Sequence, residues 1–118
     1  MKLRIQANSL RLRLTQAEVN RLRDGGHVES SIEFAAGCSL SYLVEGSRGA
    51  ESLSAGFDGQ AIRVTVPVRQ LTEWADSDQV GIRSPSPDGV EVLIEKDFQC
   101  LHRSVEEEPD AFPHPLRS

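Results

Sequence analysis

The sequence predicts an α+β fold with about eight short, mainly antiparallel strands and two short helices. Three observations support this prediction. Runs of alternating apolar and polar residues recur along the chain, as in half-buried strands. Two of these runs lead directly into a brief helical pattern. The order strand-strand-helix-strand-strand occurs twice, in residues 1–45 and 53–97. We therefore interpret the chain as two ββαββ pseudo-repeats that form a barrel-like or sandwich core.

The first half begins with a predicted hairpin. Residues 2–7 and 9–14 both alternate, and the short link between them favours antiparallel pairing, with Asn8 suited to a left-handed turn residue. Thr15 and Glu18 have the spacing of a capping box, which predicts a helix that ends at the two glycines 25–26. Two further strands are predicted from residues 27–34 and 38–44.

The second half repeats this order. A weak strand at 53–57 and the hairpin signal at 58–59 precede a strong strand at 61–66. Pro67 stands at the expected first position of a helix that extends to Trp74. Strands at 80–82 and 90–94 follow, and Pro85 and Pro87 between them predict a hairpin at a sheet edge. With an offset of 52 positions (61 minus 9), the apolar residues of the two halves coincide, including Val28 with Val80, Leu40 with Val92, and Tyr42 with Ile94.

Length and composition predict a single domain over residues 1–103 and an acidic, proline-containing C-terminal tail or strap over 104–118. The net charge of -5 combines a basic first quarter with this acidic tail, and the acidity argues against nucleic acid as a partner. The chain has no apolar run long enough to cross a membrane. Its two cysteines, Cys38 and Cys100, cannot form a disulfide framework, so we expect a cytoplasmic protein.

Both ends of the chain carry distinctive motifs. These are residues 1–5 (MKLRI), 8–15 (NSLRLRLT), 95–101 (EKDFQCL) and 110–113 (DAFP). In these motifs the chain resembles a family of small bacterial proteins of unknown function. The resemblance implies a bacterial, cytosolic, one-domain protein, and it brings no catalytic residue with it.

One group of candidate catalytic residues lies in the segment 91–102. Glu91, Glu95 and Asp97 share a face if the last strand stays regular, and clustered carboxylates can bind a divalent cation or act as an acid–base pair. Cys100 and His102 are two residues apart, a spacing that suits a thiolate nucleophile beside an imidazole. This segment supports one alternative, a small metal-dependent or cysteine-dependent hydrolase.

A metal site is a weaker interpretation of the same segment. Cys100 and His102 form one pair of potential ligands, with Cys38 or His114 needed to complete a set. Structural zinc sites usually show two such pairs at a regular spacing. We therefore predict neither a metal nor a cofactor.

A second group of candidates is basic. Arg4, Arg11, Arg13 and Arg63 lie on the polar faces of their predicted strands, and guanidinium groups suit carboxylate or phosphate ligands. Aromatic residues, which single-stranded nucleic acid needs for stacking, are missing among them. We expect a non-enzymatic binding or protein-interaction module with an anionic small molecule or a protein as its partner. A homodimer that exchanges its tails and has a structural role is a further alternative.

Overall fold

The computed structural model describes residues 1–84 and 89–98. Within these residues the elements follow the predicted order twice, with a helix between two pairs of strands. They are β1 (Lys2–Gln6), β2 (Ser9–Leu14), α1 (Gln16–Arg23), β3 (His27–Ala35), β4 (Cys38–Ser47), β5 (Ser54–Phe57), β6 (Ala61–Pro67), α2 (Val68–Ala75), β7 (Gly81–Arg83) and β8 (Glu91–Lys96). The prediction of an α+β fold with eight strands and two helices is confirmed. Residues 104–118, the predicted tail, lie outside the described part.

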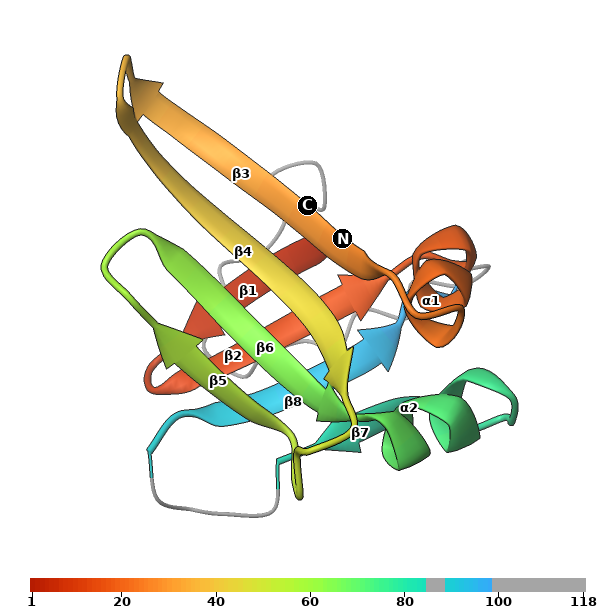
Figure 1. Cartoon of the computed structure of the whole chain (residues 1–118). Helices are drawn as coiled ribbons and strands as arrows, with labels where there is room; N and C mark the ends of the chain where they lie inside the picture. Colours follow the sequence, from red (N-terminus) through yellow and green to blue (C-terminus); the bar gives the residue numbers. More distant parts are fainter. Residues whose placement is uncertain (85–88, 99–118) are drawn as a thin grey trace, which may run out of the picture.

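The strands form two four-stranded sheets, and each sheet combines strands from both halves of the chain (Figure 1). Sheet A has the order β1-β2-β8-β7, and sheet B has the order β3-β4-β6-β5. The outer pairs in both sheets are antiparallel, as predicted. The two central pairs, β2 with β8 and β4 with β6, are parallel and join one half of the chain to the other.

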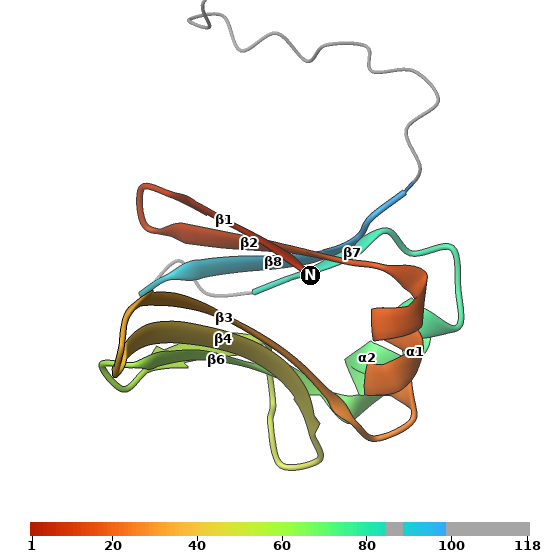
Figure 2. The ribbon, with the colours of Figure 1, turned by 90° about the horizontal axis from the view of Figure 1, so that it is seen from above.

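Figure 2 shows the two sheets facing each other, with α1 and α2 together at one end. In the described residues the strands form two separate sheets and do not close into a barrel, so the predicted barrel-like or sandwich core is an arrangement of two facing sheets. Side chains from both inner faces and from the helices form the core. Its buried residues are Leu10, Leu12, Leu14, Val19, Leu22, Val28, Val44, Leu53, Val64, Val66, Leu71, Trp74, Ile82, Val92 and Ile94.

The signals around α1 act as predicted. The Glu18 amide donates to Thr15 Oγ1 at 3.3 Å, and the Thr15 amide donates to Glu18 Oε1 at 2.9 Å, which completes the capping box. The helix ends at Arg23, and Gly25 follows with a φ of 93°, a left-handed conformation that glycine adopts without a Cβ clash.

Two local predictions differ from the structure. In the β1–β2 turn it is Ala7, with a φ of 49°, that takes the left-handed conformation, and not Asn8. The side-chain Nδ2 of Asn8 instead donates to the Gly89 carbonyl at 3.0 Å, which connects this turn to the residues just before β8. Pro67 is the last residue of β6 and the N-cap of α2, so the helix itself begins at Val68.

The last strands of the two halves correspond with a different offset from the predicted one. Leu12 of β2 lies beside Ile94, and its counterpart Val64 of β6 lies beside Val44. Val44 therefore takes the place of Ile94, and Tyr42 takes the place of Val92. The predicted matches of Leu40 with Val92 and of Tyr42 with Ile94 are each displaced by two residues.

For β3 and β7, the strands that follow the helices, the true match is displaced from the predicted one in the opposite direction. Val28 pairs with Val44, and Ile82 pairs with Ile94, so Val28 corresponds to Ile82. Val80, the predicted counterpart, is 50% exposed and precedes β7. The connection between α2 and β7 is longer than that between α1 and β3. The paired residues Ile82 and Ile94 are closer in sequence than Val28 and Val44 are, so the last strands are displaced the other way.

Glu18 also binds the ammonium group of Met1, with 2.7 Å between the nitrogen and Oε2. Burial has the largest single influence on the pKa of Glu18 and raises it. The hydrogen bonds from the ammonium and from Thr15, together with the ammonium charge, outweigh burial, so the pKa of Glu18 lies below its ordinary value of 4.5.

A lowered pKa makes the stability of the fold depend on pH. The contribution of ionised Glu18 is fully present above about pH 4.5 and is lost as the pH falls through the folded-state pKa. In urea unfolding, we expect the wild-type protein to lose about 0.5–1 kcal/mol more than Glu18→Gln between about pH 6 and pH 3. The exposed Glu51→Gln is the control and should retain the wild-type profile. Identical pH profiles for wild type and Glu18→Gln would contradict the prediction.

Candidate binding surface

The outer face of sheet A carries a group of basic side chains. Because Leu10, Leu12 and Leu14 of β2 point into the core, the residues between them point outward. The register of sheet A places Lys2 and Arg4 of β1, and Leu93 and Glu95 of β8, beside them. We call this surface the basic face. Its cationic residues are Lys2, Arg4, Arg11, Arg13 and Arg83.

The register between β1 and β2 places like charges directly opposite each other. Lys2 pairs with Arg13, and Arg4 pairs with Arg11. Directly opposed residues in an antiparallel pair have Cβ atoms about 5 Å apart, and like charges at that separation destabilise the sheet. Two such pairs follow each other along one short hairpin, so the hairpin concentrates positive charge.

Carboxylates from β8 and the residues after it neutralise part of this charge. Arg11 Nε and Arg13 Nε lie 3.3 and 3.4 Å from the same oxygen, Glu95 Oε1. Arg83 pairs with Glu91 at 2.8 Å. At the edge of the face, Lys2 Nζ lies 3.4 Å from Asp97 Oδ2. Lys2, Arg11, Arg13 and Arg83 thus pair with three carboxylates of the described residues, and the two arginines of β2 share one of these.

Arg63, the fourth predicted ligand-binding arginine, lies on the opposite side of the molecule. It points outward from sheet B and pairs with Glu45 at 3.0 Å. The outer face of β3 adds two more carboxylates, Glu29 and Glu33, so this side is mainly acidic. The four arginines therefore do not form one surface, because strands with the same alternating pattern were distributed over two sheets.

The candidates for hydrolase chemistry are not assembled into a catalytic site in the described residues. Glu91 and Glu95 both point outward from β8, but each is paired with arginine. Asp97 comes after the strand and pairs with Lys2. Cys100 and His102 lie outside the described residues. Over residues 1–84 and 89–98, no three His, Cys, Asp or Glu side chains are grouped closely enough to hold a metal ion.

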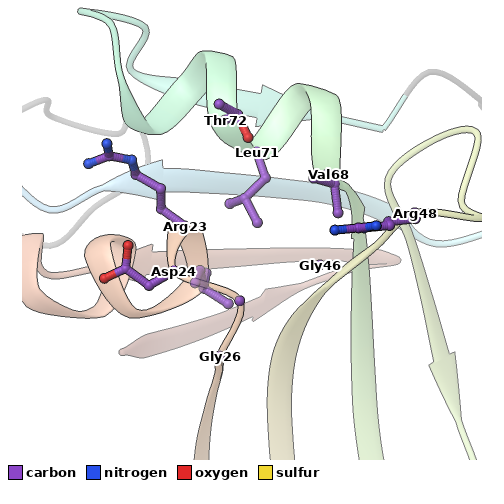
Figure 3. Close-up of a pocket in the computed structure, with 10 residues that line it drawn as sticks. Arg23, Asp24, Gly26, Gly46, Arg48, Val68, Leu71 and Thr72 are labelled. Atoms are coloured by element: carbon purple, nitrogen blue, oxygen red, sulfur yellow. The ribbon is translucent and has the colours of Figure 1, made fainter.

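A pocket with a volume of about 300 Å³ lies between the end of α1 and the start of α2 (Figure 3). Val68 and Leu71 line one side, and Gly46 of β4 lies beneath them; a Cβ at Gly46 would be 3.0 Å from Leu71 Cδ2. Arg23 and Arg48 lie at the rim, and Arg23 is already paired with Asp76 at 2.8 Å. Sequence patterns did not single out this pocket. It marks the place where α2 packs closely on sheet B.

The fold and the surface together define a small α+β protein with two mixed sheets, one of which has a basic outer face. The chain belongs to DUF7009, a family of unknown function whose model matches residues 1–116. This result confirms the expectation that the chain belongs to a family of unknown function. No curated protein and no solved structure matches the chain. In the described part, neither helix has the length and apolar character needed to span a membrane.

Proposed function

We propose that the protein is a non-enzymatic binding module and that its basic face binds an acidic segment of a protein partner. The observation that supports this most directly is the pairing of Lys2 with Arg13 and of Arg4 with Arg11 across β1 and β2. Like charges directly opposite each other repel. An anionic ligand placed over the hairpin would reduce that repulsion, so binding gives the arrangement a physical reason.

The chemistry of the face favours carboxylates over nucleic acid. A guanidinium group has parallel N–H donors that match both oxygens of a carboxylate. Arg11 and Arg13 each approach Glu95 with Nε at the distances given above, and both side chains are nearly half exposed, at 40% and 48%. Donors therefore remain accessible from outside. The basic residues contain no aromatic side chain among them for base stacking, and the protein as a whole is acidic.

The first experiment measures binding of a fluorescein-labelled, glutamate-rich peptide to the full chain by fluorescence anisotropy. The double variant Arg11→Gln/Arg13→Gln should weaken binding about tenfold or more, because charge-assisted hydrogen bonds contribute about 1.5–3 kcal/mol each. Arg63→Gln is the matched control: it also removes an ion-paired strand arginine, but from sheet B. It should leave the affinity unchanged.

Salt provides a second readout of the same proposal. Raising the ionic strength from about 0.01 to 1 M shortens the screening length roughly tenfold, so wild-type affinity should fall steeply. Equal loss of affinity in Arg63→Gln and in the double variant would contradict a site on sheet A. Affinity that is independent of salt would contradict an electrostatic site.

We further propose that the protein is cytoplasmic and bacterial, as its sequence suggests, with residues 1–103 as one domain and 104–118 as a tail.

We also propose that the two halves arose as copies of one ββαββ unit. The supporting observation is that Arg11 and Glu95 in sheet A correspond in register to Arg63 and Glu45 in sheet B, and both pairs form ion pairs.

A further inference from the structure

The sandwich is open at the end away from the helices. Along the inner face of sheet B, Val28 and Val44 are almost fully buried. Further along β3, towards the β3–β4 turn, the side chains on the same face become exposed. Ile32 is 49% exposed and Phe34 is 67% exposed. Burial therefore decreases along the inner face of β3 towards the turn, although Ile32 and Phe34 are apolar.

Neighbouring strands contribute to the same open end. Phe57 of β5 pairs with Ile62 of β6 and is 65% exposed, and Ile5 of β1 is 59% exposed beside Leu10. Figure 1 shows that the β3–β4 hairpin projects well beyond sheet A, which explains why sheet A does not cover it. We call the exposed apolar residues of this end the apolar mouth: Ile5, Ile32, Phe34 and Phe57.

The size of the apolar mouth suits a short peptide. A fully buried aromatic side chain covers about 150–250 Å², so two phenylalanines and two isoleucines that are half to two-thirds exposed offer a few hundred Å². A stable interface between folded proteins needs about 800 Å² from each partner. The mouth alone is smaller than that, and it matches the area that a few apolar side chains of an extended segment would cover.

We propose that residues 111–116 of this same chain cover the apolar mouth, with Phe112 as the inserted side chain. This sequence, AFPHPL, has two large apolar residues, and its two prolines favour an extended backbone that loses little entropy on docking. It is the most apolar stretch of the chain outside the described residues. Docking would shield both the segment and the mouth from water.

The segment can reach the mouth from the end of β8. The Asp97 amide donates to the Leu14 carbonyl at 2.8 Å, and its carboxylate pairs with Lys2, so the chain leaves β8 on the β1 side of sheet A. The five residues of β1 span roughly 17 Å. The fourteen residues that follow Phe98, up to and including Phe112, extend to roughly 46 Å, which is more than enough.

Charge also favours this path. Glu106, Glu107, Glu108 and Asp110 lie between Phe98 and Phe112, and a chain that crosses from the end of β8 to the mouth passes the basic face. The docking of Phe112 stands on the apolar mouth and does not require the proposed function. If both hold, an external acidic partner competes with the chain's own acidic run.

Cys38 allows a direct test, since it is exposed in the β3–β4 hairpin, paired with Ala35 and close to Phe34. A nitroxide spin label on Cys38 in the Cys100→Ser variant of the whole chain should broaden the amide resonances of Ala111, Phe112, His114 and Leu116. Adding Phe112→Ala should abolish most of this broadening. Phe98→Ala, which removes an exposed aromatic residue where the chain leaves β8, is the matched control and should preserve it.

Two outcomes would overturn the proposal. The first is broadening that is absent, or that is equal with and without Phe112→Ala. The second is broadening seen only when spin-labelled chains are mixed with isotope-labelled chains that carry no nitroxide, which would assign the segment to a second copy and favour tail exchange. The result is separate from the peptide-binding experiment, because neither Arg11 nor Arg13 is changed here.

Discussion

Replacing Trp74 with alanine should lower the free energy of unfolding by about 3–5 kcal/mol, a large part of the stability of a domain of this size. Trp74 is the largest of the fully buried side chains, with none of its surface exposed. It lies on α2, and its indole Nε1 donates to the Val80 carbonyl at 2.9 Å, which connects the helix to the segment before β7. Alanine would leave a cavity and an unpaired carbonyl. Urea unfolding followed by circular dichroism measures the loss.

Two further variants separate the causes of this loss. Trp74→Phe keeps most of the apolar volume but removes the hydrogen bond, so it should cost less than Trp74→Ala. Phe98→Ala deletes an aromatic side chain that is 61% exposed and should change stability by less than about 1 kcal/mol. A loss for Trp74→Ala as small as that for Phe98→Ala would show that the helix end of the sandwich is not the main core.

Sequence patterns predicted the individual elements well because the relevant signals are local. Thr15 and Glu18 lie three residues apart and form the capping box directly. Alternation in β2 and β6 determines which side chains point inward, whatever strand lies beside them. The like-charged pairs of the basic face could also have been found, since a two-residue turn sets the register that places Lys2 opposite Arg13.

The pairing between the halves could not be read in the same way. The parallel pair β2–β8 joins residues about 80 positions apart, and alternation does not specify a partner. For this reason the alternating pattern places Arg63 with Arg11 and Arg13, although sheet B holds it on the other side of the molecule. The separation of a basic face from an acidic one is a property of the topology. The two faces differ in charge because of the sheet to which each strand belongs.

The same topology makes one glycine of sheet A sensitive to substitution. Gly81 of β7 lies opposite Glu95, and a Cβ at Gly81 would be 2.7 Å from the Ile94 carbonyl oxygen. Backbone cannot yield as a flexible side chain does, so Gly81→Ala should push β7 away from β8. We expect a loss of about 1–3 kcal/mol in the free energy of unfolding.

Gly56 of β5 is the matched control for Gly81. It also lies in an edge strand, but a Cβ there would have no atom within 4 Å. Gly56→Ala should therefore leave stability unchanged or raise it by about 0.4–1 kcal/mol, because alanine restricts the unfolded chain. Thermal unfolding of both variants measures the difference. Equal melting temperatures would mean that β7 is not held against β8 as described.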